Sequence, residues 1–182
     1  MFPIIRGRES QLRRVTVLGT LLLLLCSFAL PASAAPPQPL SFTFDVTYSP
    51  IPTDVGLGSW SSGGLFSGAG DVFETYVVGG FDNCWKTLHT TSVLTGPTTE
   101  DTITVRMQIV RIVEGPPLPP PFPPLCSTIT ADGNWVILSA TGIYAGLHGQ
   151  GKATISSEFS LNPGGFLEVF VHSELQGRGH FR

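Results

Sequence analysis

The sequence predicts an all-β protein, an antiparallel barrel of about eight short strands with no substantial helix. In most segments apolar residues alternate with polar ones and do not recur every three or four positions, which is the pattern of strands. The 182-residue chain contains 21 glycines and 16 prolines, which separate these segments as turn signals. Many short strands without helices indicate a sandwich or a barrel, and we favour a barrel because closure removes unpaired sheet edges.

Residues 1–35 are predicted to be a secretory signal peptide. Four arginines precede an apolar run over residues 15–30, and the small residues over 31–35 form a cleavage site. A retained membrane anchor is the alternative, but a run of about 16 residues is shorter than the roughly 20 that span a bilayer. We therefore expect a secreted or periplasmic protein with no stable membrane anchor and a single barrel domain over residues 36–182.

Removal of the signal would leave an acidic chain. The signal contains four of the ten Lys and Arg and one of the thirteen Asp and Glu, so six basic and twelve acidic residues remain, a net charge of −6. Affinity for nucleic acid depends on clustered Lys and Arg, so we expect no nucleic-acid partner. The sequence has no metal-ligand spacing and no cofactor motif, so no cofactor and no metal are expected.

Two cysteines, Cys84 and Cys126, remain after the predicted cleavage, because Cys26 lies in the signal. An even pair in an oxidising compartment predicts a disulfide. It would close a loop of about 40 residues and stabilise the fold by roughly 3–4 kcal/mol. A metal site or a reactive thiol is the alternative, but neither cysteine has a second ligand at CxxC or CxxH spacing.

Alternation defines most of the strands. Residues 40–48 place Phe42, Phe44, Val46 and Tyr48 on one face, with Ser, Thr and Asp on the other. Further strands are predicted over residues 71–78, 84–94, 101–113, 134–140, 151–159 and 166–172.

Four segments depart from simple alternation. Residues 56–70 are rich in Gly and Ser and form one irregular strand or two short ones. Residues 110–113 are apolar on both faces, so we expect them to be covered on each side. Residues 115–124 are mostly Pro, which cannot donate to a sheet, so they form a stiff surface loop; recognition by a proline-binding domain is the alternative. The glycine-rich tail over 177–180 is expected to be mobile.

The segment ATGIYAGLHGQGKATI, residues 140–155, is predicted to be a tight corner between two strands. A dinucleotide-binding or phosphate-binding loop would need a helix after its glycines, and a strand pattern follows here. The GxSxG motif of a nucleophile elbow is absent. The four glycines between 142 and 151 permit positive φ and close backbone approach, and Tyr144 and Leu147 can point into the core.

This corner also carries a resemblance to known proteins. Residues 141–152, TGIYAGLHGQGK, with the strand that precedes them, resemble the glycine-rich turn of the allene oxide cyclase-like and dirigent-like barrels. They are also similar to secreted bacterial proteins of unknown function that carry a GTGAYAGLxGxG motif. The resemblance implies an eight-stranded antiparallel barrel whose interior could hold an apolar ligand. In the plant enzymes of that superfamily the interior guides a cyclisation, but no catalytic residues match here.

Three residues are candidates for catalysis. Glu168 and His172 share one strand face and would form an acid–base couple if that face pointed into the barrel. On the outer face they would be an ordinary solvated contact, and we favour this interpretation. His148 lies in the corner, where it is either a base at the barrel mouth or a surface turn residue, and again we favour the second.

Aromatic residues are the candidates for ligand binding. Tyr144, Trp135 and Phe170 could line a pocket, although such side chains more often form the core of a barrel.

Three functions are compatible with this sequence. We favour a non-enzymatic protein whose barrel binds a small apolar ligand. The first alternative is an isomerase or cyclase that shapes an apolar substrate, for which we expect a cavity of about 300 Å³ or more with one or two convergent polar groups. The second is a structural or interaction protein with a filled barrel. A homo-oligomer is compatible with each of them.

Overall fold

The computed structural model describes residues 35–49, 55–82, 84–117, 126–161 and 163–182, and within residues 78–88 it describes the strand backbone alone. The predicted signal peptide, apart from Ala35, lies outside the described residues, and so do residues 118–124 of the proline-rich loop. Across the described residues no helix is long and apolar enough to cross a membrane.

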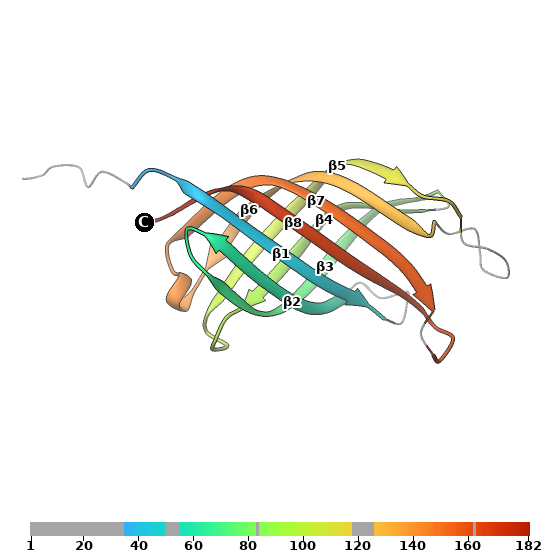
Figure 1. Ribbon diagram of the computed structural model, residues 1–182, viewed down its shortest axis with the longest axis horizontal. Helices are drawn as coiled ribbons and strands as arrows, with labels where there is room; N and C mark the ends of the chain where they lie inside the picture. Colours follow the sequence, from blue (N-terminus) through green and yellow to red (C-terminus); the bar gives the residue numbers. More distant parts are fainter. Residues whose placement is uncertain (1–34, 50–54, 83, 118–125, 162) are drawn as a thin grey trace, which may run out of the picture. The chain divides into compact units, whose positions relative to one another are not determined.

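Eight antiparallel strands form a closed barrel in which each strand pairs with its neighbours in sequence and the first pairs with the last (Figure 1). The strands are β1 (Gln38–Tyr48), β2 (Val55–Gly64), β3 (Gly68–Asp82), β4 (Cys84–Thr95), β5 (Thr102–Glu114), β6 (Thr128–Ala140), β7 (Leu147–Leu161) and β8 (Leu167–Phe181). A three-residue 3-10 turn, η1 (Gly142–Tyr144), is the one helical element among the described residues. The predicted all-β barrel is confirmed, and its strands are longer than expected, at 10 to 15 residues.

Alternation in β1 sets the inner face of the barrel. Phe42, Phe44, Val46 and Tyr48 are all buried, as predicted, because successive residues of a strand point to opposite faces. The same pattern in the first half of β5 places Ile103, Val105 and Met107 in the core with no exposed surface. The hydrophobic core is therefore the barrel interior.

A β-bulge changes the pattern in the second half of β5. The register with β6 shifts between Ile109 and Arg111, so Val110 is the extra residue and its side chain is 69% exposed. The prediction that residues 110–113 are covered on both sides is wrong, because Val113 is also exposed. The bulge instead turns Ile109 and Ile112, three positions apart, toward the interior.

The Gly- and Ser-rich segment belongs to two strands. Residues 56–64 lie in β2, residues 68–70 begin β3, and Gly64, with a φ of 87°, precedes the turn between them. Two other strands begin earlier than predicted, β6 at Thr128 and β7 at Leu147.

The predicted corner joins β6 to β7. Gly142 and Gly146 have φ values of 59° and 80°, which favour glycine, and Tyr144 and Leu147 are buried. Asp101, at the β4–β5 turn, holds this corner in place. Its Oδ1 accepts a hydrogen bond from the N–H of Ile143 at 2.9 Å, and this bond lowers the pKa of Asp101.

The glycine-rich tail, which we predicted to be mobile, is a paired strand of the barrel. It continues β8 to Phe181 and pairs with β7 on one side and β1 on the other. Gly177 lies opposite Gly151, and a Cβ at Gly177 would collide with the carbonyl oxygen of Gln150. Glycine at this position therefore allows the two strands to approach closely. The glycine content of the segment had suggested flexibility instead.

The base of the proline-rich loop is paired. Pro117 forms an isolated antiparallel bridge with Cys126, and the N–H of Gly115 donates to the carbonyl oxygen of Thr128 at 2.8 Å. Cys126 is buried, whereas the side chain of Cys84, the first residue of β4, lies outside the described part of the chain. The Cys84–Cys126 disulfide therefore stays a prediction.

Candidate functional site

Aromatic side chains fill the half of the barrel that carries the η1 corner. The rings of Phe42 and Trp135 meet edge to face with centroids 5.6 Å apart, and those of Phe66 and Tyr144 are 5.3 Å apart. Trp60 packs between them, 6.1 Å from Tyr144. Two of the predicted ligand-binding residues, Tyr144 and Trp135, thus belong to a filled aromatic core.

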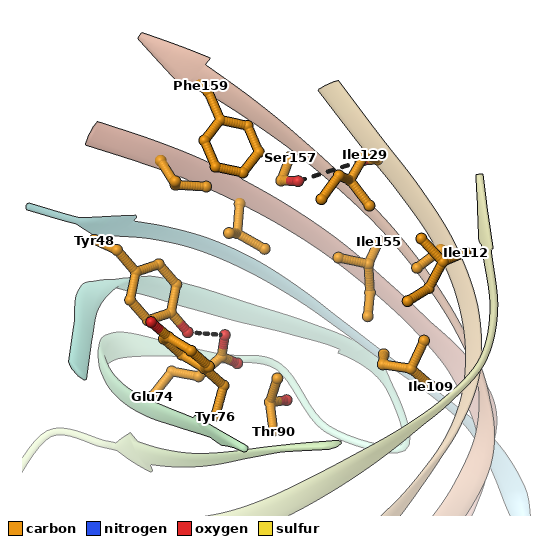
Figure 2. A pocket seen from close by; sticks show the side chains of 13 residues that line it. Tyr48, Glu74, Tyr76, Thr90, Ile109, Ile112, Ile129, Ile155, Ser157 and Phe159 are labelled. Carbon is orange, nitrogen blue, oxygen red and sulfur yellow. Dashed lines mark hydrogen bonds between the residues drawn. The ribbon is translucent and has the colours of Figure 1, made fainter. Parts of the chain in front are cut away.

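The opposite half of the interior contains a cavity of about 80 Å³. Its wall is formed mostly by aliphatic side chains from β5 to β8, with tyrosine and polar side chains from β1, β3 and β4 gathered on one side (Figure 2). The lining residues are Tyr48, Glu74, Tyr76, Thr90, Ile109, Ile112, Ile129, Ala131, Ile155, Ser157, Phe159, Val169 and Val171.

Glu74 is a buried carboxyl at this cavity. It lies on β3 between Val72 and Tyr76, and the alternation of the strand points it inward, where it is 1% exposed. Tyr48 donates a hydrogen bond to Oε1 at 2.6 Å, and Ser92 donates to Oε2 at 2.5 Å. Burial raises the pKa of Glu74, and this effect outweighs the opposing effect of the Ser92, Tyr48 and Thr90 hydroxyls. Burial therefore shifts this group toward the neutral carboxylic acid.

Tyr48 supports this group. Its ring meets that of Tyr76 edge to face, with centroids 5.1 Å apart, and burial raises the pKa of Tyr48 further above its ordinary value. The phenol therefore stays protonated and donates to Glu74.

Thr90 is the second polar side chain that opens on the cavity. It is 7% exposed, and its Oγ1 has no hydrogen-bond partner. The hydroxyl is near enough to Glu74 to lower the pKa of that carboxyl, although no hydrogen bond of normal geometry joins the two. An unpartnered buried hydroxyl costs about 1–3 kcal/mol, so a polar partner within the cavity would stabilise it.

The predicted catalytic pair lies outside the barrel. Glu168, Phe170 and His172 occupy outward positions of β8, with Phe170 47% exposed. Nδ1 of His172 is 2.7 Å from Oδ1 of Asp45, and this hydrogen bond raises the pKa of His172. Glu168 accepts a hydrogen bond from Ser49 at 2.6 Å. These contacts match the solvated alternative that the sequence favoured.

Phe170 and His172 line a second hollow, of about 470 Å³, on the outer face of β1, β6, β7 and β8. Its other side chains are mostly Ser, Thr, Asp and Glu. The inner cavity is the stronger candidate because its polar groups are desolvated and its wall is apolar.

His148 is an exposed residue of β7 and not part of the turn. It lies opposite His180 of β8, and the two rings stack with centroids 5.6 Å apart. No group of three or more His, Cys, Asp and Glu side chains that could hold a metal ion occurs in the described part of the chain.

Glu74, Tyr48 and Thr90 were missed as a site by sequence reasoning. The available signal was an acidic residue in an inward position, since Val72, Glu74 and Tyr76 share the face that the strand pattern predicts to be buried. The contacts with Tyr48 and Ser92 depend on strand pairing, which the sequence did not reveal.

No protein-family model, curated protein or solved structure matches this chain. The eight-stranded barrel and the chemistry of its cavity are therefore the basis for a functional proposal.

Proposed function

We propose that this protein is a non-enzymatic carrier or receptor that binds a small, mainly apolar ligand in the inner half of the barrel away from the η1 corner. The observation that carries the proposal is a cavity with aliphatic walls in a barrel whose other half is tightly filled. Apolar surface of this kind gains free energy when it covers an apolar ligand in place of water.

The volume of the cavity limits the ligand. At about 80 Å³ it is smaller than the roughly 300–1,000 Å³ of sites for drug-sized ligands. A single ring or a short branched chain is the size that fits, with small movements of half-buried side chains such as Tyr76 and Ile112.

Methyl NMR of isoleucine tests this proposal directly. Ile109, Ile112, Ile129 and Ile155 line the cavity, whereas Ile143 is exposed on the corner and serves as an internal reference. With toluene as the probe, we expect the Cδ1 signals of the four lining residues to shift and saturate while that of Ile143 stays unchanged. Native mass spectrometry of the purified protein would show whether an apolar molecule is already bound.

A cavity-filling variant provides the control. Ala131 is buried and lines the cavity, so Ala131→Leu should abolish the toluene shifts. Thr130→Leu adds the same side chain to the adjacent, exposed position of β6 and should leave them unchanged. Toluene shifts that survive Ala131→Leu, or that never appear, would favour the filled, structural barrel.

An isomerase or cyclase is the second candidate. The buried Glu74 carboxyl favours it, whereas the cavity of about 80 Å³ is smaller than the roughly 300 Å³ expected for such an enzyme. A neutral acid beside the carbonyl oxygen of an apolar substrate could donate its proton to that oxygen while water takes the α-proton, which gives an enol. Incubation of cyclopentanone with the protein in D₂O would test this, because acid–base catalysis at the α-carbon exchanges its hydrogens for deuterium. Exchange that is faster with the wild type than with Glu74→Gln would support the enzyme, and equal exchange would support the carrier.

We further infer that the protein is exported and related to the allene oxide cyclase-like and dirigent-like barrels. The support is the predicted signal peptide and the corner sequence over residues 141–152. The first inference is tested by the N-terminal residue of protein secreted by an expressing host, expected at Ala35 or Pro36.

A further inference from the structure

We propose that the ligand of the cavity carries one uncharged hydrogen-bonding group, a hydroxyl or a carbonyl, which binds between the Thr90 hydroxyl and the Glu74 carboxyl. This inference rests on the proposed function and names the chemical class of ligand for the same site.

Thr90 provides the first argument. Its side chain is more than nine-tenths buried, lines the cavity and leaves Oγ1 without a hydrogen-bond partner. Buried hydroxyls in folded proteins are nearly always paired, and exceptions call for a ligand or a water molecule. A hydroxyl or carbonyl on the ligand would supply the missing partner.

Glu74 provides the second argument. Tyr48 and Ser92 each donate to one of its oxygens, at 2.6 and 2.5 Å. A neutral carboxyl carries its proton on one of these oxygens, and that O–H can donate either to the neighbouring hydroxyl or to an acceptor in the cavity. That proton is therefore available to a ligand acceptor beside Thr90, in the polar part of the wall that Figure 2 shows.

The charge of the lining selects against ionic ligands. Among the described side chains no Lys, Arg or His lines the cavity, so a ligand carboxylate would meet no counter-charge from them beside Glu74. A ligand ammonium would require Glu74 to ionise while it is buried, and burial raises the pKa of that group. An uncharged polar group avoids both costs.

Phenol and toluene, which differ by a hydroxyl in place of a methyl group, test the inference. Both are titrated into the purified protein at pH 6 and followed by the isoleucine Cδ1 signals. A wholly apolar site would bind phenol at least about tenfold more weakly than toluene, because burial of an unpaired hydroxyl is unfavourable. We expect phenol to bind this protein at least as tightly as toluene.

Variants of Thr90 assign the preference to this residue. Thr90→Val keeps the shape of the side chain and removes the hydroxyl. It should weaken the binding of phenol relative to that of toluene by about tenfold. Thr90→Ser keeps the hydroxyl and should retain the preference. Thr91→Val, at the next and outward position of β4, should change neither affinity.

A variant of Glu74 tests whether the carboxyl is neutral. This test remains valid even if the Thr90 variants do not fold. Glu74→Gln is uncharged and keeps one donor and one acceptor, so it should bind phenol within about threefold of the wild type. A loss of tenfold or more would mean that an ionised carboxylate holds the hydroxyl, and would overturn the proposal.

The outcomes separate this inference from the proposed function. If toluene shifts the cavity signals and phenol binds at least tenfold more weakly, the apolar carrier stands and the polar ligand class is overturned. Tighter binding of benzoate or benzylamine than of phenol would overturn it in the same way. If no probe shifts these signals, both proposals fail.

Discussion

The hydroxyl of Tyr48 lies 2.6 Å from Oε1 of Glu74, inside a barrel whose sequence separates the two residues by 26 positions. The contact joins the end of β1 to the middle of β3, across β2. Glu74 is 1% exposed, and the described residues that line the cavity include no Lys, Arg or His, so its environment favours the neutral form.

Replacement of Glu74 should change how stability depends on pH. The folded protein holds the proton of Glu74 more tightly than the unfolded chain, in which the pKa is near 4.5. The stabilisation is complete below that value and is lost as pH rises toward the raised pKa of the folded state, by up to about 1.4 kcal/mol per pH unit. Glu74→Gln should remove this decline, measured by urea unfolding at a series of pH values.

Glu158→Gln is the control for that experiment, because Glu158 is an exposed residue of β7. Its curve should run parallel to that of the wild type. If the Glu74→Gln curve also ran parallel to the wild type, Glu74 would have to be ionised in the folded protein.

Asp45 should set the titration of His172. The hydrogen bond between them raises the pKa of the imidazole, so Asp45→Asn should lower it toward 6.5. The stabilisation by protonated His172 is complete below pH 6.5 and is lost as pH rises through the folded pKa. Since both side chains are largely exposed, the loss of stability should stay below about 1 kcal/mol. NMR titration of the imidazole Cε1 proton measures the shift.

Glu174→Gln should have a smaller effect on the same titration, because Oε1 of Glu174 is 3.6 Å from Nε2 of His172. A larger pKa shift of His172 in this variant than in Asp45→Asn would contradict the prediction, because it would make Glu174 and not Asp45 the main influence on the imidazole.

The corner should depend on Gly142 for two separate reasons. Its φ of 59° is unfavourable for other residues, and an added Cβ would collide with Oδ1 of Asp101 and lie 2.9 Å from its Cα. Gly165 has a similar φ of 79° but open space around it. Gly165→Ala should cost about 1–2 kcal/mol of unfolding free energy, and Gly142→Ala should cost more. Equal losses in chemical denaturation would show that Asp101 does not confine the corner.

The two cysteines outside the signal should form a disulfide. Intact protein purified under non-reducing conditions should be two hydrogens lighter than the reduced chain, and neither Cys84 nor Cys126 should react with iodoacetamide until it is reduced. Substitution of both by Ser should lower the free energy of unfolding by about 3–4 kcal/mol, since the loop between them holds about 40 residues. Alkylation of the native protein at both cysteines would contradict this prediction.

The pattern of the sequence determined the barrel strands and the faces that they bury. Alternation in residues 40–48 and 101–109 identified Phe42, Phe44, Ile103 and Val105 as core residues, because side-chain direction in a strand has a period of two. The corner was also predictable from local sequence. A tight turn requires glycine where φ is positive, and the apolar Tyr144 between the glycines is buried in the core.

Only the tertiary structure decided where polar groups meet. Closure of β1 onto β8 ordered the glycine-rich tail, and the bulge near Val110 turned Ile109 and Ile112 inward, although neither is visible in local alternation. The polar side of the cavity joins Tyr48, Glu74 and Thr90 from three strands, and their meeting depends on the register between those strands. Local alternation in the sequence determined which face of the barrel each residue occupies. Register and closure are set by the sum of many pairings across the barrel, so only the fold decided which residues share a site.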